Sequence, residues 1–315
     1  MKIDFTVPPE YENTRLDHLM AQIIPDCSRS RAASLISSGH LQVDGQTRKP
    51  AYKVRAGDTV FGQLPEESPG RVIAEPSHLD ILYEDTHVLV INKPAGLVVH
   101  PGAGNAQGTL VNALLHHDPG IARAGEDPLR PGIVHRLDKD TSGVMVVART
   151  ARAAEFLKKE FKYRRVDKRY LCLVTGVIKA DKGEIDLPIG RHPVKRKLMS
   201  ARSDAPRSAL TLWRVKERFV SASLVEARIK TGRTHQIRVH FYTQGYPLIG
   251  DPVYQYRKAR KNQGGQTKAG RQMLHAFQIS FRHPFSGQRM AFEAELPDDF
   301  IKISSYLRQL QAAPA

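Results

Sequence analysis

Residues 132–149 read GIVHRLDKDTSGVMVVAR, and in this stretch a dense polar cluster separates two apolar runs. The pattern predicts a loop between two buried strands. Loops held by a rigid sheet are where reactive groups are usually placed. The cluster carries two carboxylates, Asp138 and Asp140, with cations on both sides. Either is a candidate catalytic group, and the alternative is a polar turn whose charges are only solvated.

Strand-like segments dominate the chain around this loop and after it. They are 79–85, 87–94, 143–149, 168–176, 208–219, 220–232, 278–284 and 290–297. In the same part of the chain, helical periodicity covers 109–117, 151–163, about 234–243 and 297–310. Because strands and helices do not alternate regularly, the order favours an α+β fold with a mixed or antiparallel sheet over a doubly wound parallel one.

The first 63 residues form a smaller α+β pattern of their own. Helical stripes cover 15–24 and 28–40, and an Asp-Gly pair at 44–45 signals a hairpin turn before a last strand at 58–64. The stretch LPEESPGRVIAEP, 64–76, holds three prolines and two adjacent glutamates, which suit neither a helix nor a strand interior. The sequence therefore predicts a domain over 1–63, a linker over 64–76 and a second domain over 77–315.

The chain of 315 residues carries 48 Lys and Arg against 32 Asp and Glu, a formal charge of +16. This excess points to a polyanionic partner, nucleic acid before an acidic membrane surface. Basic clusters lie at 158–169, 191–197 and 257–271, and the last is predicted to be a mobile loop. The chain has no membrane-spanning apolar run, no signal-peptide pattern and only two cysteines. We therefore expect a cytoplasmic protein that is not bound to a membrane and holds no metal.

A second polar stretch, KTGRTHQIRVHF at 230–241, is predicted to be a helix that starts near Thr234. Arg233 would then lie at the positive start of the helix, beside the 132–143 loop. There it could pair with a carboxylate of that loop and keep it ionised. The alternative is a phosphate-binding helix end without a catalytic part.

The strand predicted at 168–176 carries a tyrosine. Alternation places Tyr170, Cys172 and Val174 on one face and Leu171 and Leu173 on the other. A strand tyrosine of this kind is most often a core residue whose hydroxyl reaches the rim.

Four stretches together resemble the motifs of the RluA-type RNA pseudouridine synthases. They are NKPAGLVVHPG (92–102), HRLDKDTSG (135–143), KRYLCLVTG (168–176) and KTGRTHQIRVH (230–240), in the family's order and roughly its spacing. RLDHLM (15–20) and SRSRAASLISSGHLQVDG (28–45) resemble an S4 RNA-binding domain. An S4 domain before such a catalytic domain is similar to the RluD subgroup, which acts on large-subunit ribosomal RNA.

The resemblance implies roles for individual residues. Asp138, directly after Arg-Leu, matches the family's nucleophilic aspartate, whereas Asp140 matches no role. Tyr170 matches the active-site tyrosine, and Arg233 matches the conserved arginine of the late motif. Arg136 matches the arginine that enters the RNA helix where the target base was. Further RNA contacts are expected from His135, Lys168 and Gln236 in the catalytic domain and from Arg29, Arg31 and Arg48 in the S4-like domain.

The implied reaction converts uridine to pseudouridine: a C–N glycosidic bond breaks, the base rotates and a C–C bond forms. Nothing is oxidised and no group leaves for good, so we expect no cofactor and no metal. One carboxylate acts on the ribose or the base, as a covalent nucleophile or as a base at the sugar, and these alternatives stay open. The implied substrate is 23S ribosomal RNA in its helix 69 stem-loop, with the target uridine flipped out of its stack. We expect the enzyme to be a monomer.

Two other classes of function remain as alternatives. One is a non-catalytic RNA-binding ribosome assembly factor with a decayed site, which would have no need of Asp138, Tyr170 and Arg233 together. The other is a glycoside hydrolase that uses Asp138 and Asp140. Two carboxylates two residues apart on a tight loop need not face each other across a sugar, and the +16 charge suits a polyanion better than a neutral glycan.

Overall fold

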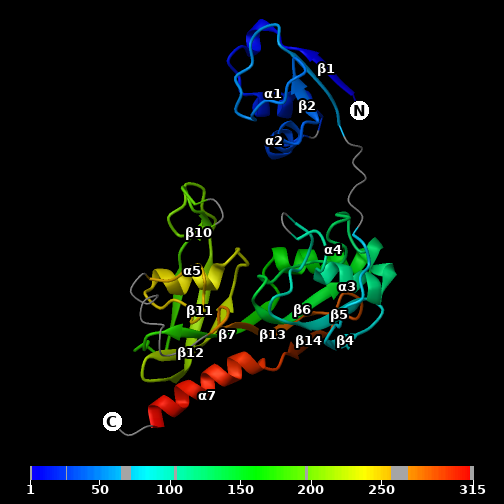
Figure 1. Cartoon of the computed structure of the whole chain (residues 1–315). Helices are drawn as coiled ribbons and strands as arrows, with labels where there is room; N and C mark the ends of the chain where they lie inside the picture. The colour runs from blue at the N-terminus through cyan, green and yellow to red at the C-terminus, as the bar shows by residue number, and fades with distance from the viewer. Residues whose placement is uncertain are drawn as a thin grey trace. The chain divides into compact units, whose positions relative to one another are not determined.

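The chain, described here by a computed structural model, divides into two compact units, residues 1–70 and 71–315 (Figure 1). The structure describes residues 2–25, 27–64, 72–102, 105–195, 198–256 and 269–312. Each unit buries a hydrophobic core of its own. Within these ranges, no helix is both long enough and apolar enough to span a lipid bilayer.

The first unit is a three-stranded antiparallel sheet, in the order β1-β3-β2, with two α-helices. Its elements are β1 (Lys2–Thr6), the 3-10 helix η1 (Pro9–Tyr11), α1 (Leu16–Ile23), α2 (Arg29–Ser37), β2 (Leu41–Val43) and β3 (Thr59–Gln63). The Ser28 side chain caps α2 by accepting a hydrogen bond from the Arg31 amide at 3.2 Å. Both predicted helices are therefore present. Strand β1 was not predicted, and it pairs with β3 along its whole length.

The second unit is built on a nine-stranded sheet in the order β4-β5-β6-β13-β7-β12-β11-β8, with β14 beside β13. All its pairings are antiparallel except that of β6 with β13, so the predicted α+β class with a mixed sheet is confirmed. The strands are β4 (Ile81–Glu84), β5 (Val88–Lys93), β6 (Ser142–Ala148), β7 (Asp167–Thr175), β8 (Lys182–Asp186), β11 (Leu210–Arg218), β12 (Ala222–Ile229), β13 (Leu274–Arg282) and β14 (Arg289–Glu293). The other elements are α3 (Leu110–His117), η2 (Pro119–Arg123), α4 (Ala151–Lys162), α5 (Gln236–Thr243), α7 (Asp298–Ala312) and a hairpin of β9 (Gly190–Arg191) and β10 (Met199–Ser200).

Strand β7 separates two apolar layers, as its alternation predicted. Tyr170, Cys172 and Val174 belong to the large core that also holds residues of α3, α4 and α5. Leu171 and Leu173 face the smaller cluster built around α7. In Figure 1, α3, α4 and α5 accordingly lie over one face of the sheet and α7 runs along the other.

The stretch 132–149 enters the middle of this sheet. Its apolar end forms β6, which is buried along its whole length and pairs in parallel with the start of β13. Gly143 lies opposite Ala276 with a φ of 116°, and a Cβ at this position would come within 2.2 Å of the Ala276 carbonyl oxygen. Only glycine permits this approach. The preceding loop is thereby anchored at the centre of the sheet.

The predicted linker is partly ordered against the second unit. Val72 is buried with Val111 and Leu115 of α3. The Asn112 side-chain amide donates to the Ile73 carbonyl at 2.7 Å, and the Glu75 amide donates to the Asn112 carbonyl at 3.0 Å. Residues 72–75 thus pack as part of the second unit and not as a spacer. Residues 65–71 of the predicted linker and 257–268 of the predicted basic loop lie outside the described residues.

Candidate active site

The loop that carries Asp138 is held through its backbone by two cations from elsewhere in the fold. Lys93, at the end of β5, is fully buried, and its Nζ donates to the carbonyls of Pro94, Leu97 and Lys139 at 2.7, 2.9 and 2.9 Å. Arg271 donates from Nη1 to the Asp140 carbonyl at 2.9 Å. Two consecutive carbonyls directly after Asp138, those of Lys139 and Asp140, are satisfied in this way. The position of the Asp138 side chain therefore follows from contacts far away in the sequence.

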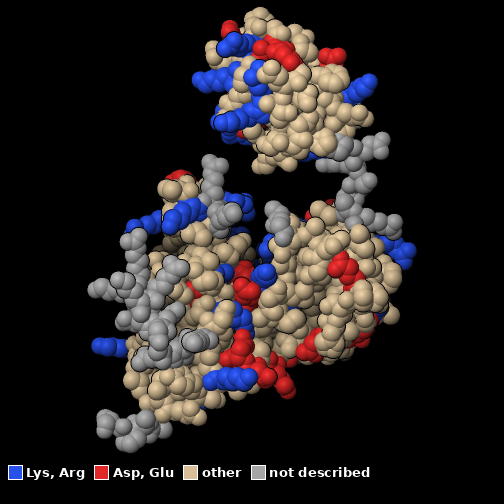
Figure 2. Space-filling model, in the orientation of Figure 1, with Lys and Arg blue, Asp and Glu red and all other residues tan. Residues whose placement is uncertain are grey.

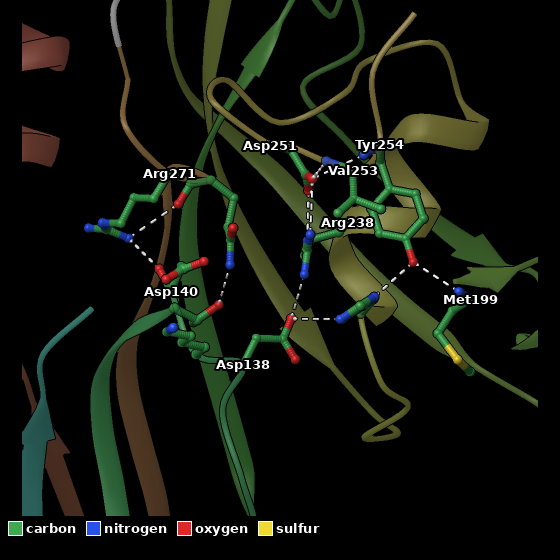
Figure 3. Close-up of polar contacts among 12 residues, drawn as sticks. Asp138, Asp140, Met199, Arg238, Asp251, Val253, Tyr254 and Arg271 are labelled. Carbon is green, nitrogen blue, oxygen red and sulfur yellow. Dashed lines mark hydrogen bonds and ion pairs between the residues drawn. The ribbon is translucent and has the colours of Figure 1, made fainter. Parts of the chain in front are cut away.

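A buried chain of charges leads to the Asp138 carboxylate (Figure 3). Arg238, on α5, donates from Nη1 to Asp138 Oδ2 at 3.1 Å. The same guanidinium donates twice to the fully buried Asp251, at 2.7 and 3.0 Å. The backbone amides of Val253 and Tyr254 donate to Asp251 Oδ1, the oxygen that also accepts Arg238 Nη2. Burial opposes the charge on Arg238, but the hydrogen bonds and charge of Asp251, and then those of Asp138, outweigh it and raise the pKa of Arg238.

The arginine that pairs with the loop carboxylate is Arg238 and not Arg233, so that prediction is wrong. Arg233 turns its Nε to the Ser208 carbonyl at 3.1 Å. The helix begins only at Gln236, because His235 takes a left-handed conformation with a φ of 57°. Arg233 therefore stands before the helix, on an irregular segment, whereas Arg238 is carried by the first turn of α5. The motif contains both arginines, and its spacing alone does not say which one reaches Asp138.

His235 lies on the other side of the Asp138 carboxylate. Its Nδ1 is 2.8 Å from the Tyr254 hydroxyl, and its Nε2 is 3.9 Å from Asp138 Oδ2. The Tyr254 oxygen already accepts the Met199 amide at 3.0 Å, so its own proton is available to His235 Nδ1. That assignment leaves the Nε2 proton directed at Asp138. Burial lowers the pKa of His235 despite the nearby Asp138 charge, so the ring is neutral at pH 7.

These groups open into a cavity of about 590 Å³ between α4 and α5. Figure 2 shows the second unit hollowed between these two helices, with basic and acidic side chains together in the hollow. All seven site residues predicted in this unit line the cavity: His135, Arg136, Asp138, Lys168, Tyr170, Arg233 and Gln236. The fold thus brings together residues from three separate motifs. In the described part of the chain, no three His, Cys, Asp or Glu side chains are placed to hold a metal ion.

Tyr170 presents its ring and hydroxyl to the cavity from β7. It is 7% exposed, and its hydroxyl makes no hydrogen bond to any described residue. Burial, and then the charge of Asp138, raises the pKa of Tyr170. The hydroxyl is therefore protonated at neutral pH. The predicted position in the core is the one observed, and Tyr170 also lines the cavity.

Two residues predicted to contact RNA are occupied by the protein itself. Gln236 is 3% exposed, and its amide makes four hydrogen bonds, with Thr231, the Arg233 amide, Leu210 and Thr211. It holds α5 to β11, and no donor or acceptor remains for a ligand. The ring of His135 accepts the Val146 amide at 3.0 Å and stacks on Phe161. Burial, with the Lys168 charge, lowers the pKa of His135 to about 3, so this side chain stays neutral and supports the loop.

Arg136 and Arg29 are exposed, whereas Arg31 and Arg48 are half-buried. Arg136 is exposed at the rim of the cavity, with Nη1 3.2 Å from His100 Nε2. Arg29 pairs with Asp17 at 3.1 Å and keeps half of its side chain exposed, and Arg31 follows on the same helix. Arg48 stacks over the Tyr52 ring at 5.0 Å. Lys and Arg gather along one side of this unit in Figure 2.

Several residues of the site carried no predicted role. Arg238 lies inside the stretch KTGRTHQIRVHF, and Lys93 is a charge at the end of an apolar run. Asp251, Tyr254 and Arg271 stand in segments without any recognised motif. Lys93 directly follows the apolar run VLVIN, which predicts a buried strand. A lysine at the end of such a strand is the one sequence signal that indicates a buried charge near the site.

Comparison with known proteins agrees with the geometry. The family model described as RNA pseudouridylate synthase matches residues 87–243, and the S4 domain model matches residues 14–60. Ribosomal large subunit pseudouridine synthase D of Pseudomonas aeruginosa is 46% identical over 309 residues, covering 96% of this chain and 95% of its own. The uncharacterized RNA pseudouridine synthase YlyB of Bacillus subtilis is 42% identical, covering 98% of this chain and 99% of its own.

A solved structure has the same catalytic fold. The structure of human RNA Pseudouridylate Synthase Domain Containing 1 superposes with a TM-score of 0.58 at 28% sequence identity. The match covers 76% of this chain and 98% of the human one. The matched fraction of this chain is close to the fraction that the second unit, residues 71–315, makes up.

Proposed function

Because this chain belongs to the RNA pseudouridylate synthase family and carries an S4 domain, we propose that it isomerises uridines of 23S ribosomal RNA to pseudouridine. The enzyme class is the one that the four sequence motifs predicted. The ribosomal substrate is supported by relatives named large subunit pseudouridine synthase D and by the charge of +16. Within that RNA we propose the helix 69 stem-loop as the target, and we place the reaction in the cytoplasm. A decayed, non-catalytic site is disfavoured because the charge chain to Asp138 is complete.

One observation carries the mechanism: a single carboxylate, Asp138, faces the cavity while its partners are buried behind it. Arg238 is shared between Asp138 and the fully buried Asp251, so the three groups together keep one negative charge. That charge lies at the wall where a uridine would sit. We propose that Asp138 attacks the ribose or the base, or removes a proton from the sugar, to break the C–N bond. Arg238 orients the carboxylate, and the neutral His235 beside it adds no competing charge.

The tyrosine is proposed to handle the base. With its ring at the cavity wall, Tyr170 packs against the uracil while it is detached and rotated. The raised pKa of Tyr170 opposes the formation of a phenolate, which argues against this hydroxyl as an unassisted base for the C5 proton. Transfer of that proton must then involve another acceptor. We propose stacking as the main role of Tyr170.

The cavity admits one nucleotide and not a duplex, so the target uridine must leave its stack. A volume of about 590 Å³ is within the range of small-ligand sites. Arg136, exposed at the rim, is placed to enter the RNA in place of the flipped base. Its contact with His100 holds the guanidinium at the rim before RNA arrives.

The substrate proposal is tested by incubating purified enzyme with 23S ribosomal RNA from a strain that lacks it. Pseudouridine is mapped by carbodiimide modification and primer extension, and we expect new stops in helix 69. Asp138→Asn enzyme and RNA with cytidine at the target positions are the controls. New pseudouridines only in transfer RNA, or only elsewhere in ribosomal RNA, would reject helix 69 as the target.

A further inference from the structure

Lys168 is a cation on the cavity wall that has no anionic partner. It lies on β7, two residues before Tyr170, and both side chains line the cavity. Its Nζ makes no hydrogen bond or ion pair with a described residue, and its one specific contact is with the Phe161 ring, 5.5 Å from the centroid. A Cβ on Gly232 would lie 3.8 Å from this Nζ, so the ammonium reaches across to the segment before α5.

The neighbouring acid does not neutralise Lys168. Asp167 is already bound by the Arg228 and Arg169 guanidiniums. Burial lowers the pKa of Lys168 to about 8, with the Asp167 charge opposing this only in part. A largely buried ammonium without an anion is unfavourable, because its lost hydration is not replaced. An unpaired ammonium of this kind indicates that a bound substrate supplies the anion that pairs with Lys168.

More cations surround the same wall at the end of α4. Lys158, Lys162 and Arg164 are exposed and line the cavity. Arg164 directly follows the C-cap of α4 and takes the left-handed conformation common there, with a φ of 60°, while the Arg165 amide donates to the Glu160 carbonyl at 2.9 Å. Lys159 on the same helix differs: it pairs with Glu155 at 2.6 Å and does not line the cavity.

We propose that Lys168 binds the phosphodiester of the flipped uridine, with Lys162 and Arg164 holding the phosphate of its neighbour. This inference rests on the proposed RNA substrate and extends it to the backbone of the target nucleotide. Residues i and i+2 of a strand share a face and lie about 7 Å apart. A uracil against Tyr170 therefore directs its phosphate toward Lys168. The phosphate supplies the missing anion, and the ammonium gains a charge-assisted hydrogen bond.

The first test compares Lys168→Met and Lys168→Arg with the wild type on a 23S ribosomal RNA transcript. Losing a charge-assisted hydrogen bond is expected to raise KM about tenfold or more, with kcat changed less than about twofold. Lys168→Arg keeps the charge and should recover most of the loss. Lys159→Ala is the matched control and should leave KM unchanged. A fall in kcat with unchanged KM would overturn the proposal, because it would indicate a part in the chemistry.

Folding does not confound this test. Replacing a desolvated, unpaired ammonium by a methionine of similar length removes a burial penalty, so the Tm of Lys168→Met should equal or exceed that of the wild type. The double rim variant Lys162→Ala, Arg164→Ala should lower the slope of log affinity against log salt by about 0.7, the value for one phosphate contact on single-stranded RNA.

The sharper test removes the charge from the RNA instead. A stem-loop with an uncharged methylphosphonate at the target uridine should bind the wild type about tenfold more weakly than the unmodified stem-loop does. The Lys168→Met variant should bind the modified and the unmodified stem-loop with equal affinity. Additive effects of the two changes would refute the contact. Wild-type product formation is scored separately. Absence of pseudouridine in ribosomal RNA would refute the proposed substrate, while the affinity cycle would still decide the phosphate contact.

Discussion

The two units each contain a buried cluster of arginine and aspartate, and the two residue types exchange places between the clusters. In the first unit one aspartate, Asp17, lies between Arg15 and Arg29 at 2.9 and 3.1 Å. In the second unit one arginine, Arg238, lies between Asp138 and Asp251 at 3.1 and 2.7 Å. In both cases the central group is almost fully buried and an outer group reaches the surface or the cavity.

This exchange of places decides what each cluster presents to RNA. Around Asp17 the surplus charge is positive and sits on two half-exposed arginines, which suits contact with phosphates. Around Arg238 the surplus is negative and sits on Asp138 at the cavity wall. We propose that this carboxylate acts on the ribose or the base, while the phosphate of the same nucleotide lies against Lys168. We therefore propose that the same two residue types contact RNA phosphates in one unit and provide a reactive carboxylate in the other.

The largest effect is expected at the carboxylate that faces the cavity. Asp138→Asn should reduce kcat by a factor on the order of 10⁴ or more, as removal of a nucleophile does. The variant should fold and bind RNA, because the amide keeps the shape of the side chain. Tritium release from RNA that carries 5-tritiated uridine measures the rate, because C5 loses its hydrogen when the new C–C bond forms. Asp140→Asn is the control and should retain most of the activity, since only its backbone carbonyl is bound by Arg271.

The central arginine is expected to affect stability as well as turnover. Arg238→Met leaves Asp251 buried without its partner and should destabilise the second unit by about 3–5 kcal/mol. Urea unfolding of the full chain measures this loss. The double variant Arg238→Met, Asp251→Asn should recover part of the stability without recovering activity. Equal stability of the wild type and Arg238→Met would mean that the charge chain does not support the fold.

The central aspartate of the first unit is expected to make stability depend on acid. The hydrogen bond from Arg15, aided by Arg29, outweighs burial and lowers the pKa of Asp17. The folded pKa is thus below the unfolded value of about 3.9, so this contribution is present above that pH and is lost as pH falls below it. Asp17→Asn should lose about 1.5–3 kcal/mol at pH 6 and show a flatter dependence between pH 5 and 3. Parallel curves for the two proteins would contradict the assignment.

The smallest effect is expected from removing the first unit altogether. Deleting residues 1–70 should raise KM about tenfold and lower the salt dependence of binding, because phosphate contacts are lost, with kcat retained at saturating RNA. A full-length Arg29→Ala variant serves as the point-mutant control and should reproduce a fraction of the loss. Complete loss of turnover at saturating RNA, with the second unit still folded, would show that the first unit takes part in the chemistry.

Periodicity and motif order predicted much of this molecule. The alternation along 168–176 placed Tyr170 and Leu171 on opposite faces, because the twofold repeat of a strand is local. The same reasoning missed β1, whose short run Ile3-Asp4-Phe5 becomes a strand only by pairing with β3. It also chose Arg233 over Arg238, because a helix start displaced by the left-handed His235 changes which arginine points inward.

The sequence by itself determined the enzyme family, the α+β class and the S4 domain, and it singled out Asp138 as the proposed reactive carboxylate, because these follow from local pattern and from motifs that are contiguous in the chain. Only the tertiary structure decided the environment of that carboxylate. Lys93 and Lys139 are 46 residues apart, and Arg238 and Asp138 are 100 apart. Long side chains such as these reach their partners only after the sheet has formed. The fold therefore decides whether a buried cation binds backbone carbonyls, as Lys93 does, forms an ion pair, as Arg238 does, or has no anionic partner in the described part of the chain, as is the case for Lys168.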